Sequence, residues 1–243
     1  MPIYDLSLSN VTKIDGGYGH SLAVTTGGKS YAWGLNDNYQ LGNGNTTNLL
    51  TPTQIGSDTD WVDVACGDYH SVAIKSNGTA YAWGRNVENQ CGRANTSSGY
   101  VTTPTLVVFP QTTTIDKIAA SKNYTLFADT GIRRTVYGAG ENNFKVLHSS
   151  FVGFTTPTAI AEFANATLIA AGPQLCGAVI GSEIRVRGVY DFSYESAVSD
   201  MYTPLANPLA ATVPNSTSPI SYLSLGIGYD FLLAIKQDGT LWG

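Results

Sequence analysis

The sequence is built from copies of one unit. Residues 14–42, IDGGYGHSLAVTTGGKSYAWGLNDNYQLG, superpose without a gap on residues 64–92, VACGDYHSVAIKSNGTAYAWGRNVENQCG. A repeated unit of this kind cannot bury its own apolar face, so neighbouring copies must stack to form a continuous core. We therefore expect the chain to fold as an array of similar units.

Each unit has the pattern of a β-hairpin. In the second copy, Val72 and Ile74 alternate with small residues in one run, and Tyr81 and Trp83 do so in the next. The Asn-Gly dipeptide at 77–78 between the runs tolerates the positive φ angles of a two-residue hairpin turn. The hairpin therefore has one bulky face and one small face, and it needs neighbours on both sides.

About five copies follow one another along the chain. The third copy has Tyr124 where the first two have His20 and His70, the fourth has Leu175 there, and the fifth has Phe231. We expect a single domain over residues 1–243, with repeats at about 11–60, 61–114, 115–164, 165–221 and 222–243, and with residues 1–10 as the outer strand of the last repeat.

A proline-led extended segment recurs between the hairpins, at Pro52, Pro104, Pro157 and Pro204. Proline suits an edge strand, where its missing N–H leaves no ladder bond unmade. Each unit is thus predicted to have four strands: a short entry strand of small residues, the two arms of the hairpin, and the proline-led outer strand. Small entry strands can crowd a central axis, so the pattern predicts an all-β fold, a β-propeller of four-stranded blades.

The two ends of the chain each have the pattern of part of a blade, which is relevant to how such a ring closes. Met1-Pro2-Ile3 precedes Val11 by the spacing at which Thr51-Pro52-Thr53 precedes Trp61, and the last copy stops in mid-strand. Joined, the two termini would complete one blade, which predicts a five-bladed ring closed by its ends. The alternative is that the chain forms part of a larger ring.

Residues 15–42 and 65–92 share a small-small-Gly start, His-Ser-Leu/Val-Ala, a glycine turn, Tyr-Ala-Trp-Gly and a closing Gln-X-Gly. This pattern resembles the regulator of chromosome condensation repeat (the RCC1 repeat). The resemblance implies a propeller, most often seven-bladed, that serves as a binding scaffold. The family includes an exchange factor for a small GTPase, a plant ultraviolet photoreceptor and a secreted bacterial inhibitor of β-lactamases. The photoreceptor function needs an arrayed tryptophan cluster with interleaved arginines, which the framework residues Trp33 and Trp83 do not provide.

Composition narrows the classes of partner. Only 13% of the residues are charged, the net charge is −5 and the isoelectric point is about 5.0. Nucleic-acid binding needs clustered Lys and Arg, so a nucleic-acid partner is not expected. The apolar runs are too short to cross a bilayer, so we expect no membrane insertion. The three cysteines are scattered and predict buried thiols, with neither a zinc site nor a disulfide framework.

No catalytic constellation is apparent. His20 and His70 occupy the same position of separate repeats, and Phe231 takes that position in the fifth. A position that accepts phenylalanine is neither a metal ligand nor a general base, so both histidines are interpreted as hydrogen-bonded structural residues. We predict a protein that is not an enzyme and has no catalytic residue, cofactor or metal.

Tyrosines in the loops are the first candidates for partner binding, because interfaces are enriched in Tyr and Trp. Tyr18, Tyr69 and Tyr229 recur in the turn between the entry strand and the hairpin. This recurrence predicts that they lie together on one rim of the ring. The polar connections predicted for the opposite rim are Leu35–Tyr39, Arg85–Asn89 and Ala139–Asn143. The alternative is that the tyrosines fill the space between blades.

The long connection within residues 190–219 is a second candidate surface, because long irregular insertions on a rigid scaffold often carry function. Its candidate binding residues are Tyr190, Phe192, Tyr194 and Tyr202. The alternative is drift in a degenerate repeat.

These observations predict a non-catalytic propeller module that binds other proteins or surface glycans, or has a structural role, within a larger assembly. Low charge and abundant Thr, Asn and Gly suggest an extracellular or phage virion or tail setting. The alternative is an intracellular regulator of a small GTPase that acts as a nucleotide exchange factor.

Overall fold

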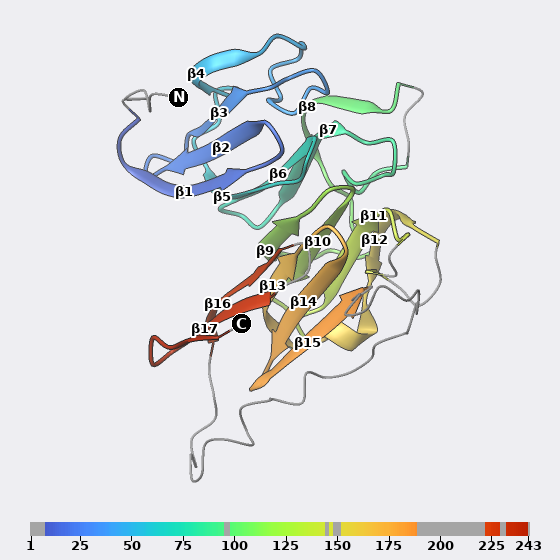
Figure 1. Ribbon diagram of the computed structural model, residues 1–243. Coiled ribbons are helices and arrows are strands. Elements are labelled where there is room, and N and C mark those ends of the chain that lie inside the picture. The colour runs from blue at the N-terminus through green and yellow to red at the C-terminus, as the bar shows by residue number, and fades with distance from the viewer. Residues whose placement is uncertain are drawn as a thin grey trace, which may run out of the picture.

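The computed structural model describes residues 8–94, 98–143, 146–147, 152–188, 222–228 and 232–242. Within these ranges the chain forms five antiparallel sheets that follow one another in sequence order. The sheets lie along an arc, from the blue first sheet at the top of Figure 1 to the red last sheet at its lower left. This arrangement confirms the predicted all-β architecture of successive blades.

The first three sheets each have four strands in chain order. The first sheet consists of β1 (Val11–Gly16), β2 (His20–Thr25), β3 (Ser30–Gly34) and β4 (Leu49–Gln54). The second consists of β5 (Trp61–Cys66), β6 (His70–Lys75), β7 (Ala80–Arg85) and β8 (Tyr100–Leu106). The third consists of β9 (Ile115–Ala120), β10 (Tyr124–Asp129), β11 (Val136–Gly140) and β12 (Phe154–Ala159). The predicted proline-led outer strands are confirmed here, because Pro52, Pro104 and Pro157 lie in β4, β8 and β12.

The fourth and fifth sheets have three described strands each. They are β13 (Ala166–Ala171), β14 (Leu175–Ile180) and β15 (Glu183–Gly188), after a short 3-10 helix η1 (Ala161–Phe163), and then β16 (Tyr222–Ile227), β17 (Leu232–Lys236) and β18 (Leu241–Trp242). Residues 1–7 and Pro204, which carry the predicted outer strands of these two sheets, lie outside the described residues. Closure of a five-bladed ring by the termini therefore stays a prediction.

The first strand of each sheet is the innermost, as predicted. Contacts run from β1 to β5, β9, β13 and β16 in turn. The backbones approach closely there: a Cβ built on Gly67 would lie 2.3 Å from the carbonyl oxygen of Ser121, and one on Gly17 would lie 2.2 Å from that of Gly67. Only glycine fits this spacing, which explains the glycines directly after β1 and β5.

A glycine lies at or next to the end of the third strand in each of the first four sheets. The φ angles of Gly34, Gly84, Gly140 and Gly188 are 102°, 99°, 116° and 132°. A Cβ at any of these positions would also lie within 2.7 Å of a carbonyl oxygen of the adjacent turn. Both constraints require glycine, so the glycine of each Trp-Gly pair marks a fixed backbone bend, as do its equivalents Gly140 and Gly188.

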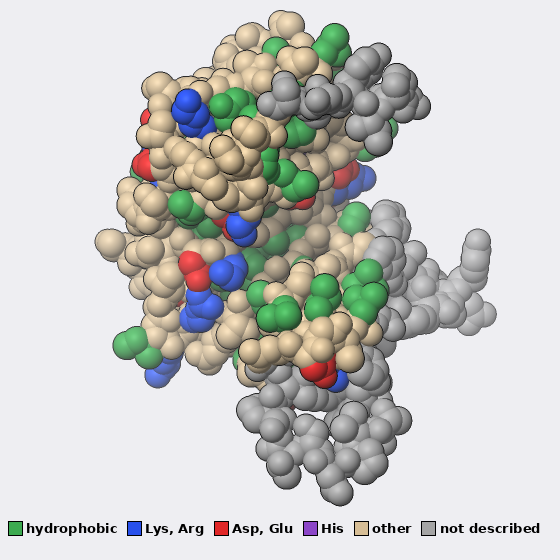
Figure 2. Space-filling model, turned by 90° about the vertical axis from the view of Figure 1, so that its left-hand side faces the viewer, with side chains coloured by type: hydrophobic (Ala, Val, Ile, Leu, Met, Phe, Trp, Pro, Cys, Tyr) green, Lys and Arg blue, Asp and Glu red, His purple; other side chains and the backbone are tan. Residues whose placement is uncertain are grey.

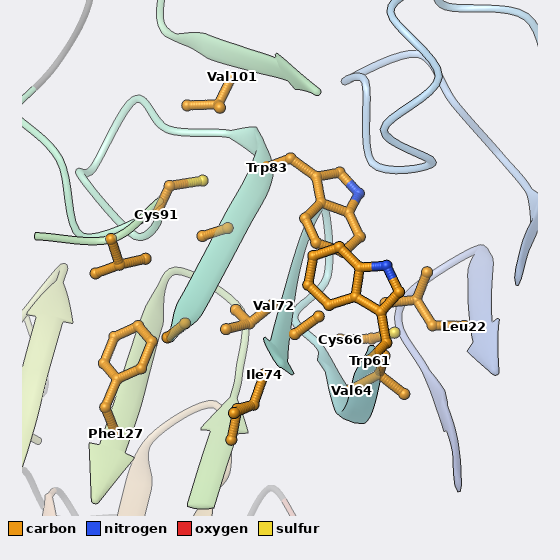
Figure 3. Close-up of a cluster of buried hydrophobic side chains, with 14 of the residues drawn as sticks. Leu22, Trp61, Val64, Cys66, Val72, Ile74, Trp83, Cys91, Val101 and Phe127 are labelled. Atoms are coloured by element: carbon orange, nitrogen blue, oxygen red, sulfur yellow. The ribbon is translucent and has the colours of Figure 1, made fainter. Parts of the chain in front are cut away.

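The core lies between the sheets. Figure 3 shows Trp61 and Trp83 of the second sheet packed toward Leu22 of the first, while Val72, Ile74 and Phe127 pack on the other side of the second sheet. The ring centroids of the two tryptophans are 6.5 Å apart. One buried cluster joins the first three sheets and another joins the third sheet to the fourth. In the described part of the chain, no helix is long and apolar enough to cross a membrane.

Candidate functional site

One rim of the arc carries two kinds of connection. The turns between the first and second strands meet the loops that follow the third strands: Leu35 N donates to Gly19 O at 2.7 Å, and Arg85 N donates to Tyr69 O at 2.9 Å. In an antiparallel meander these two connections lie at the same end of the sheet. The prediction that Leu35–Tyr39, Arg85–Asn89 and Ala139–Asn143 lie on the opposite rim from Tyr18 and Tyr69 is therefore wrong. We call this edge, with turns 17–19, 67–69 and 121–123 and the loops that start at 35, 85 and 141, the loop rim.

Tyr18 and Tyr69 lie side by side on the loop rim. Their ring centroids are 5.5 Å apart, and Tyr18 N donates to Asp68 O at 3.2 Å across the boundary between the first and second sheets. The Tyr18 side chain is 72% exposed, so it does not fill the space between blades. The expected juxtaposition of these two residues is confirmed, and their role in binding stays a prediction.

A second aromatic pair on the same rim was not predicted. Tyr39, in the loop after β3, and Tyr100, at the start of β8, have ring centroids 5.6 Å apart. Tyr39 has a φ angle of 61°, in the left-handed region that favours Asn. The equivalent residue of the second sheet is Asn89, with a φ angle of 65°. A bulky aromatic residue in this conformation is costly, and comparison of the two copies could have shown Tyr39 as a candidate.

Polar groups continue the rim beyond the tyrosines. The Arg85 guanidinium pairs with the Glu88 carboxylate and donates to Asn123 Oδ1 at 3.2 Å, and the Asn123 amide donates to Glu141. This chain of contacts links the second and third sheets. Beside it, burial raises the pKa of Asp68, and the nearby Lys122 opposes that shift. The loop rim thus combines the exposed Tyr18 ring and three half-buried tyrosine rings with fixed polar groups.

The histidines join sheets and do not form part of this surface. His20 Nε2 lies 3.0 Å from Ser71 Oγ, which donates to Gln40 O at 2.7 Å. The same arrangement recurs one sheet later, with His70 Nε2 2.8 Å from Thr125 Oγ1, which donates to Gln90 O at 2.8 Å. Burial lowers the pKa of His20 to about 4 and that of His70 to about 3. We call this set of His, hydroxyl and Gln carbonyl the inter-sheet clasp; it supports the structural interpretation of both histidines.

The clasp is modified between the third and fourth sheets. Tyr124, at the histidine position, places its hydroxyl 2.7 Å from Gly172 O and 2.8 Å from Leu175 O, and Cys176 donates to Val146 O at 2.8 Å in place of the hydroxyl residue. The three cysteines are buried and free, as predicted. Burial raises their thiol pKa values. In the described ranges no three His, Cys, Asp or Glu side chains gather to hold a metal ion.

The remaining candidates lie outside the described residues. These are Tyr190, Phe192, Tyr194, Tyr202 and Tyr229. Their role in binding stays a prediction from the sequence.

Two family models, both described as the regulator of chromosome condensation (RCC1) repeat, match the N-terminal half of the chain. One matches residues 27–74 and 77–128, and the other matches residues 11–40 and 61–90. Both include the clasp residue His70 and part of the loop rim.

Among curated proteins, the chain is similar to the Arabidopsis thaliana ultraviolet-B receptor UVR8, with 41% identity over 64 residues, which is 26% of this chain and 14% of the receptor. It is also similar to the Schizosaccharomyces pombe protein pim1, with 43% identity over 51 residues, which is 21% of this chain and 10% of that protein. These matches cover only a small part of either relative.

Among solved structures, human WBSCR16 matches with a TM-score of 0.79 at 19% identity, over 96% of this chain and 61% of that one. Yeast RCC1 (Prp20), solved bound to Kap60, matches with a TM-score of 0.75 at 19% identity, over 96% of this chain and 55% of that one. Such identities show a shared fold, and this chain spans less than two thirds of either structure.

Proposed function

Because the chain belongs to the family of RCC1-repeat propellers, we propose that it is a non-catalytic scaffold that binds another protein through the loop rim. The contact surface consists of the Tyr18–Tyr69 and Tyr39–Tyr100 pairs, both at the boundary between the first and second sheets. The exposed Tyr18 ring, held against Tyr69 where the turns 17–19 and 67–69 meet, is the observation that carries this proposal.

The chemistry of the rim favours a protein partner. Tyrosine presents a large amphipathic area and loses little side-chain entropy on binding, so it is a common interface anchor. The polar groups from Arg85 to Glu141 flank the aromatic pairs as a rim of hydrogen-bonding groups would. The yeast relative was solved bound to Kap60, and Prp20p of Saccharomyces cerevisiae has been characterised for its binding to Gsp1p and histones. Those partners belong to that protein and support protein binding here only by family likeness.

An extracellular or virion setting rests on composition alone and stays a prediction, as does glycan binding. Exchange activity toward a small GTPase is the second candidate, supported by the likeness to the Gsp1p-binding relative. Release of labelled GDP from a panel of small GTPases tests it directly. If the chain accelerates the release of GDP, its function is nucleotide exchange and not protein binding alone.

The loop-rim proposal is tested by site-specific photo-crosslinking in an extract of the source cells. A benzoylphenylalanine at position 18 of the full chain is expected to trap a discrete protein. The control carries the same group at Ile132, which is exposed in the turn between β10 and β11 on the opposite rim. Mass spectrometry identifies the trapped protein.

Binding of the identified protein is then measured by calorimetry. The double variant Tyr18→Ala/Tyr69→Ala is expected to weaken binding at least tenfold, because loss of interface anchors usually costs about 2 kcal/mol or more. Ile132→Ala should bind like the parent chain. Equal affinity of the double variant and the parent would refute the proposal, as would crosslinking only from position 132.

A further inference from the structure

The loop after β3 differs from its copy in the second sheet at a strained residue. Tyr39 has a φ angle of 61°, where the copy has Asn89 at 65°. This left-handed conformation is costly for a bulky aromatic side chain and easy for asparagine. The first sheet therefore keeps a strained tyrosine at a position where its own copy has an unstrained residue.

The next residue, Gln40, has a buried amide group without an acceptor. Gln40 is 0% exposed, and its Nε2 has no hydrogen-bond partner among the described residues. In the second sheet, the equivalent Gln90 Nε2 donates to the Glu88 carboxylate at 3.4 Å. The first sheet has the shorter Asn38 in place of Glu88. Because the Glu88 side chain is 25% exposed, this acceptor position lies at the surface of the loop. A buried amide without an acceptor destabilises the folded chain, so an acceptor from a partner would be stabilised there.

Both tyrosine pairs of the loop rim lie beside this loop. In the two pairs the ring centroids are 5.5 Å and 5.6 Å apart, and the ring planes are tilted by 45° and 52°. A Cβ on Gly84 would lie 2.7 Å from Tyr69 O and 3.3 Å from Gln40 Cα. Tyr69 belongs to one pair, and Gln40 follows Tyr39 of the other. The two pairs and the buried amide therefore form one continuous surface.

Two carboxylates accompany the rings. Asp37 is exposed in the same loop, and Asp68 directly precedes Tyr69. Neither forms an ion pair within the part of the chain that the structure describes. Burial raises the pKa of Asp68 in spite of the nearby Lys122, so a further cation beside it would be stabilised. Figure 2 shows that acidic and basic side chains are sparse and interspersed on the side where β1 and β16 lie in Figure 1. Single carboxylates, and not a broad charged field, therefore set the charge that a partner meets.

We propose that the loop rim binds a proline-rich segment of its protein partner, and that this segment carries a basic residue. The inference rests on the proposed binding role of the loop rim and specifies the ligand. A polyproline II segment has no internal hydrogen bonds, so its carbonyl groups are free to accept from the Gln40 amide. Its proline rings pack against the paired tyrosines, as such segments do in aromatic-lined grooves. The basic residue pairs with Asp68.

The first test measures the binding of two synthetic peptides to the 243-residue chain by calorimetry. One peptide has ten prolines between two arginines, and its prolines span about 31 Å in the polyproline II conformation. The control peptide has the same arginines around five Gly-Ser pairs, which form a flexible chain of equal charge. We expect the proline peptide to bind at least tenfold more tightly than the control peptide.

Two substitutions distinguish a binding loop from a purely structural one. Tyr39→Asn copies the second sheet, and Asn38→Gln brings a neutral carbonyl to the length of Glu88. Both should raise the Tm by about 2–4 °C, because strain or an unsatisfied amide is removed. Tyr39→Asn should weaken the binding of the proline peptide at least tenfold. Asn38→Gln should weaken it about fivefold, the loss that corresponds to one hydrogen bond. Ile132→Ala, on the opposite rim, should change neither quantity.

Asp68→Asn tests the basic residue. It should weaken the binding of the proline peptide by about twofold to fivefold at low salt, the range of an exposed ion pair, and have no effect at 1 M salt. Unchanged binding in Asp68→Asn at low salt would remove the basic residue from the proposal and overturn it in this form.

Other results would overturn the proposal as a whole. If the chain binds neither peptide, the rim has no affinity for proline-rich segments, and if it binds both equally tightly, charge alone explains the contact. Tyr39→Asn and Asn38→Gln variants that bind like the parent chain, or that lose Tm together with binding, would exclude the loop as a strained contact site. Binding of cellohexaose in preference to the proline peptide would assign the rings to a glycan.

Failure of this inference is distinguishable from failure of the loop-rim proposal. If a protein is trapped from position 18 and its contact segment contains no proline, the loop-rim proposal stands and this inference is overturned. Binding of the proline peptide that Tyr39→Asn abolishes supports this inference independently of the photo-crosslinking result.

Discussion

The protonation of the clasp histidines follows from their partners. The single hydroxyl hydrogen of Thr125 is donated to Gln90 O, so His70 must donate its Nε2 hydrogen to Thr125 Oγ1. His70 Nδ1 is buried without a hydrogen-bond partner among the described residues, as suits the unprotonated nitrogen. His20 bonds to Ser71 in the same way. A proton added to Nδ1 would place a charge in the core with no acceptor.

The stability of the protein should therefore fall below pH 6.5. The pKa values of His20 and His70 are lowered in the folded state from 6.5 to about 4 and about 3. The unfolded chain thus binds more protons in this window, and stability that is complete above pH 6.5 is lost as the pH falls toward 3. Urea unfolding between pH 7.5 and 5 measures the effect above the range in which carboxylates titrate.

The variant His70→Gln is the control for this pH dependence. Glutamine can donate to Thr125 without titrating, so its unfolding free energy should vary less between pH 7.5 and 5 than that of the parent chain. Identical pH profiles for the two proteins would contradict the assignment of the effect to His70.

Backbone spacing requires glycine directly after the inner strand β5. A Cβ on Gly67 would lie 2.3 Å from Ser121 O and 2.2 Å from His70 Cε1. Gly67→Ala should therefore destabilise the protein by about 1–3 kcal/mol, as overpacking usually does. Gly27→Ala is the matched control, since nothing lies within 4 Å of its Cβ position. Urea unfolding of both variants checks this; equal stabilities would show that the inner strands can move apart.

Among the elements, the loop after each third strand is organised by one asparagine. Asn86 is buried; its Oδ1 accepts from Cys91 N at 3.0 Å and its Nδ2 donates to Arg93 O at 3.2 Å. Asn36 and Asn142 accept in the same way from Leu41 N and Leu147 N. The loops of Asn36 and Asn86 carry the Gln carbonyls of the clasp, and all three loops form part of the loop rim, so the asparagine connects the fold to the proposed binding surface.

Asn86→Ala should loosen this loop and destabilise the protein by about 1–3 kcal/mol, because Cys91 N is left buried without an acceptor. Hydrogen exchange of the amides at 86–94 should accelerate more than exchange in β6. Val87→Ala, in the same loop but with an exposed side chain, should change neither quantity. Unchanged exchange in Asn86→Ala would mean that the loop is held by its other contacts.

The sequence was sufficient to predict the strands but not the partners across sheets. Alternation and proline position identified β5 to β8, and substitution by Phe231 identified the histidine position as structural. The hydroxyl that meets His70 is Thr125, which no local pattern reveals because it depends on which face of the next sheet is turned inward. The two rims were assigned wrongly for a similar reason. The turn after the first strand and the loop after the third strand lie at the same end of the sheet, which becomes visible only when the strands are paired.

Across the molecule, the third sheet separates two cores. Phe127 and Tyr137 belong to the core shared with the first two sheets, whereas Tyr124 and Leu126 belong to the core shared with the fourth. Tyr124 is the residue whose hydroxyl crosses to the fourth sheet, at Gly172 O and Leu175 O. Arrays of repeats are stabilised mainly by contacts between neighbouring repeats. The contacts between the third and fourth sheets therefore determine whether the first three sheets and the last two unfold together.

Tyr124→Phe should therefore weaken the coupling of the fourth and fifth sheets to the first three. The lost hydrogen bonds should cost about 1–2 kcal/mol, and hydrogen exchange in β14 and β17 should accelerate while exchange in β6 stays unchanged. Tyr137→Phe is the matched control in the same sheet, because the Tyr137 hydroxyl accepts from Gln111 Nε2 at 2.9 Å on the side of the second sheet. Exchange that accelerates equally in β6, β14 and β17 of Tyr124→Phe would show instead that the arc unfolds as one cooperative unit.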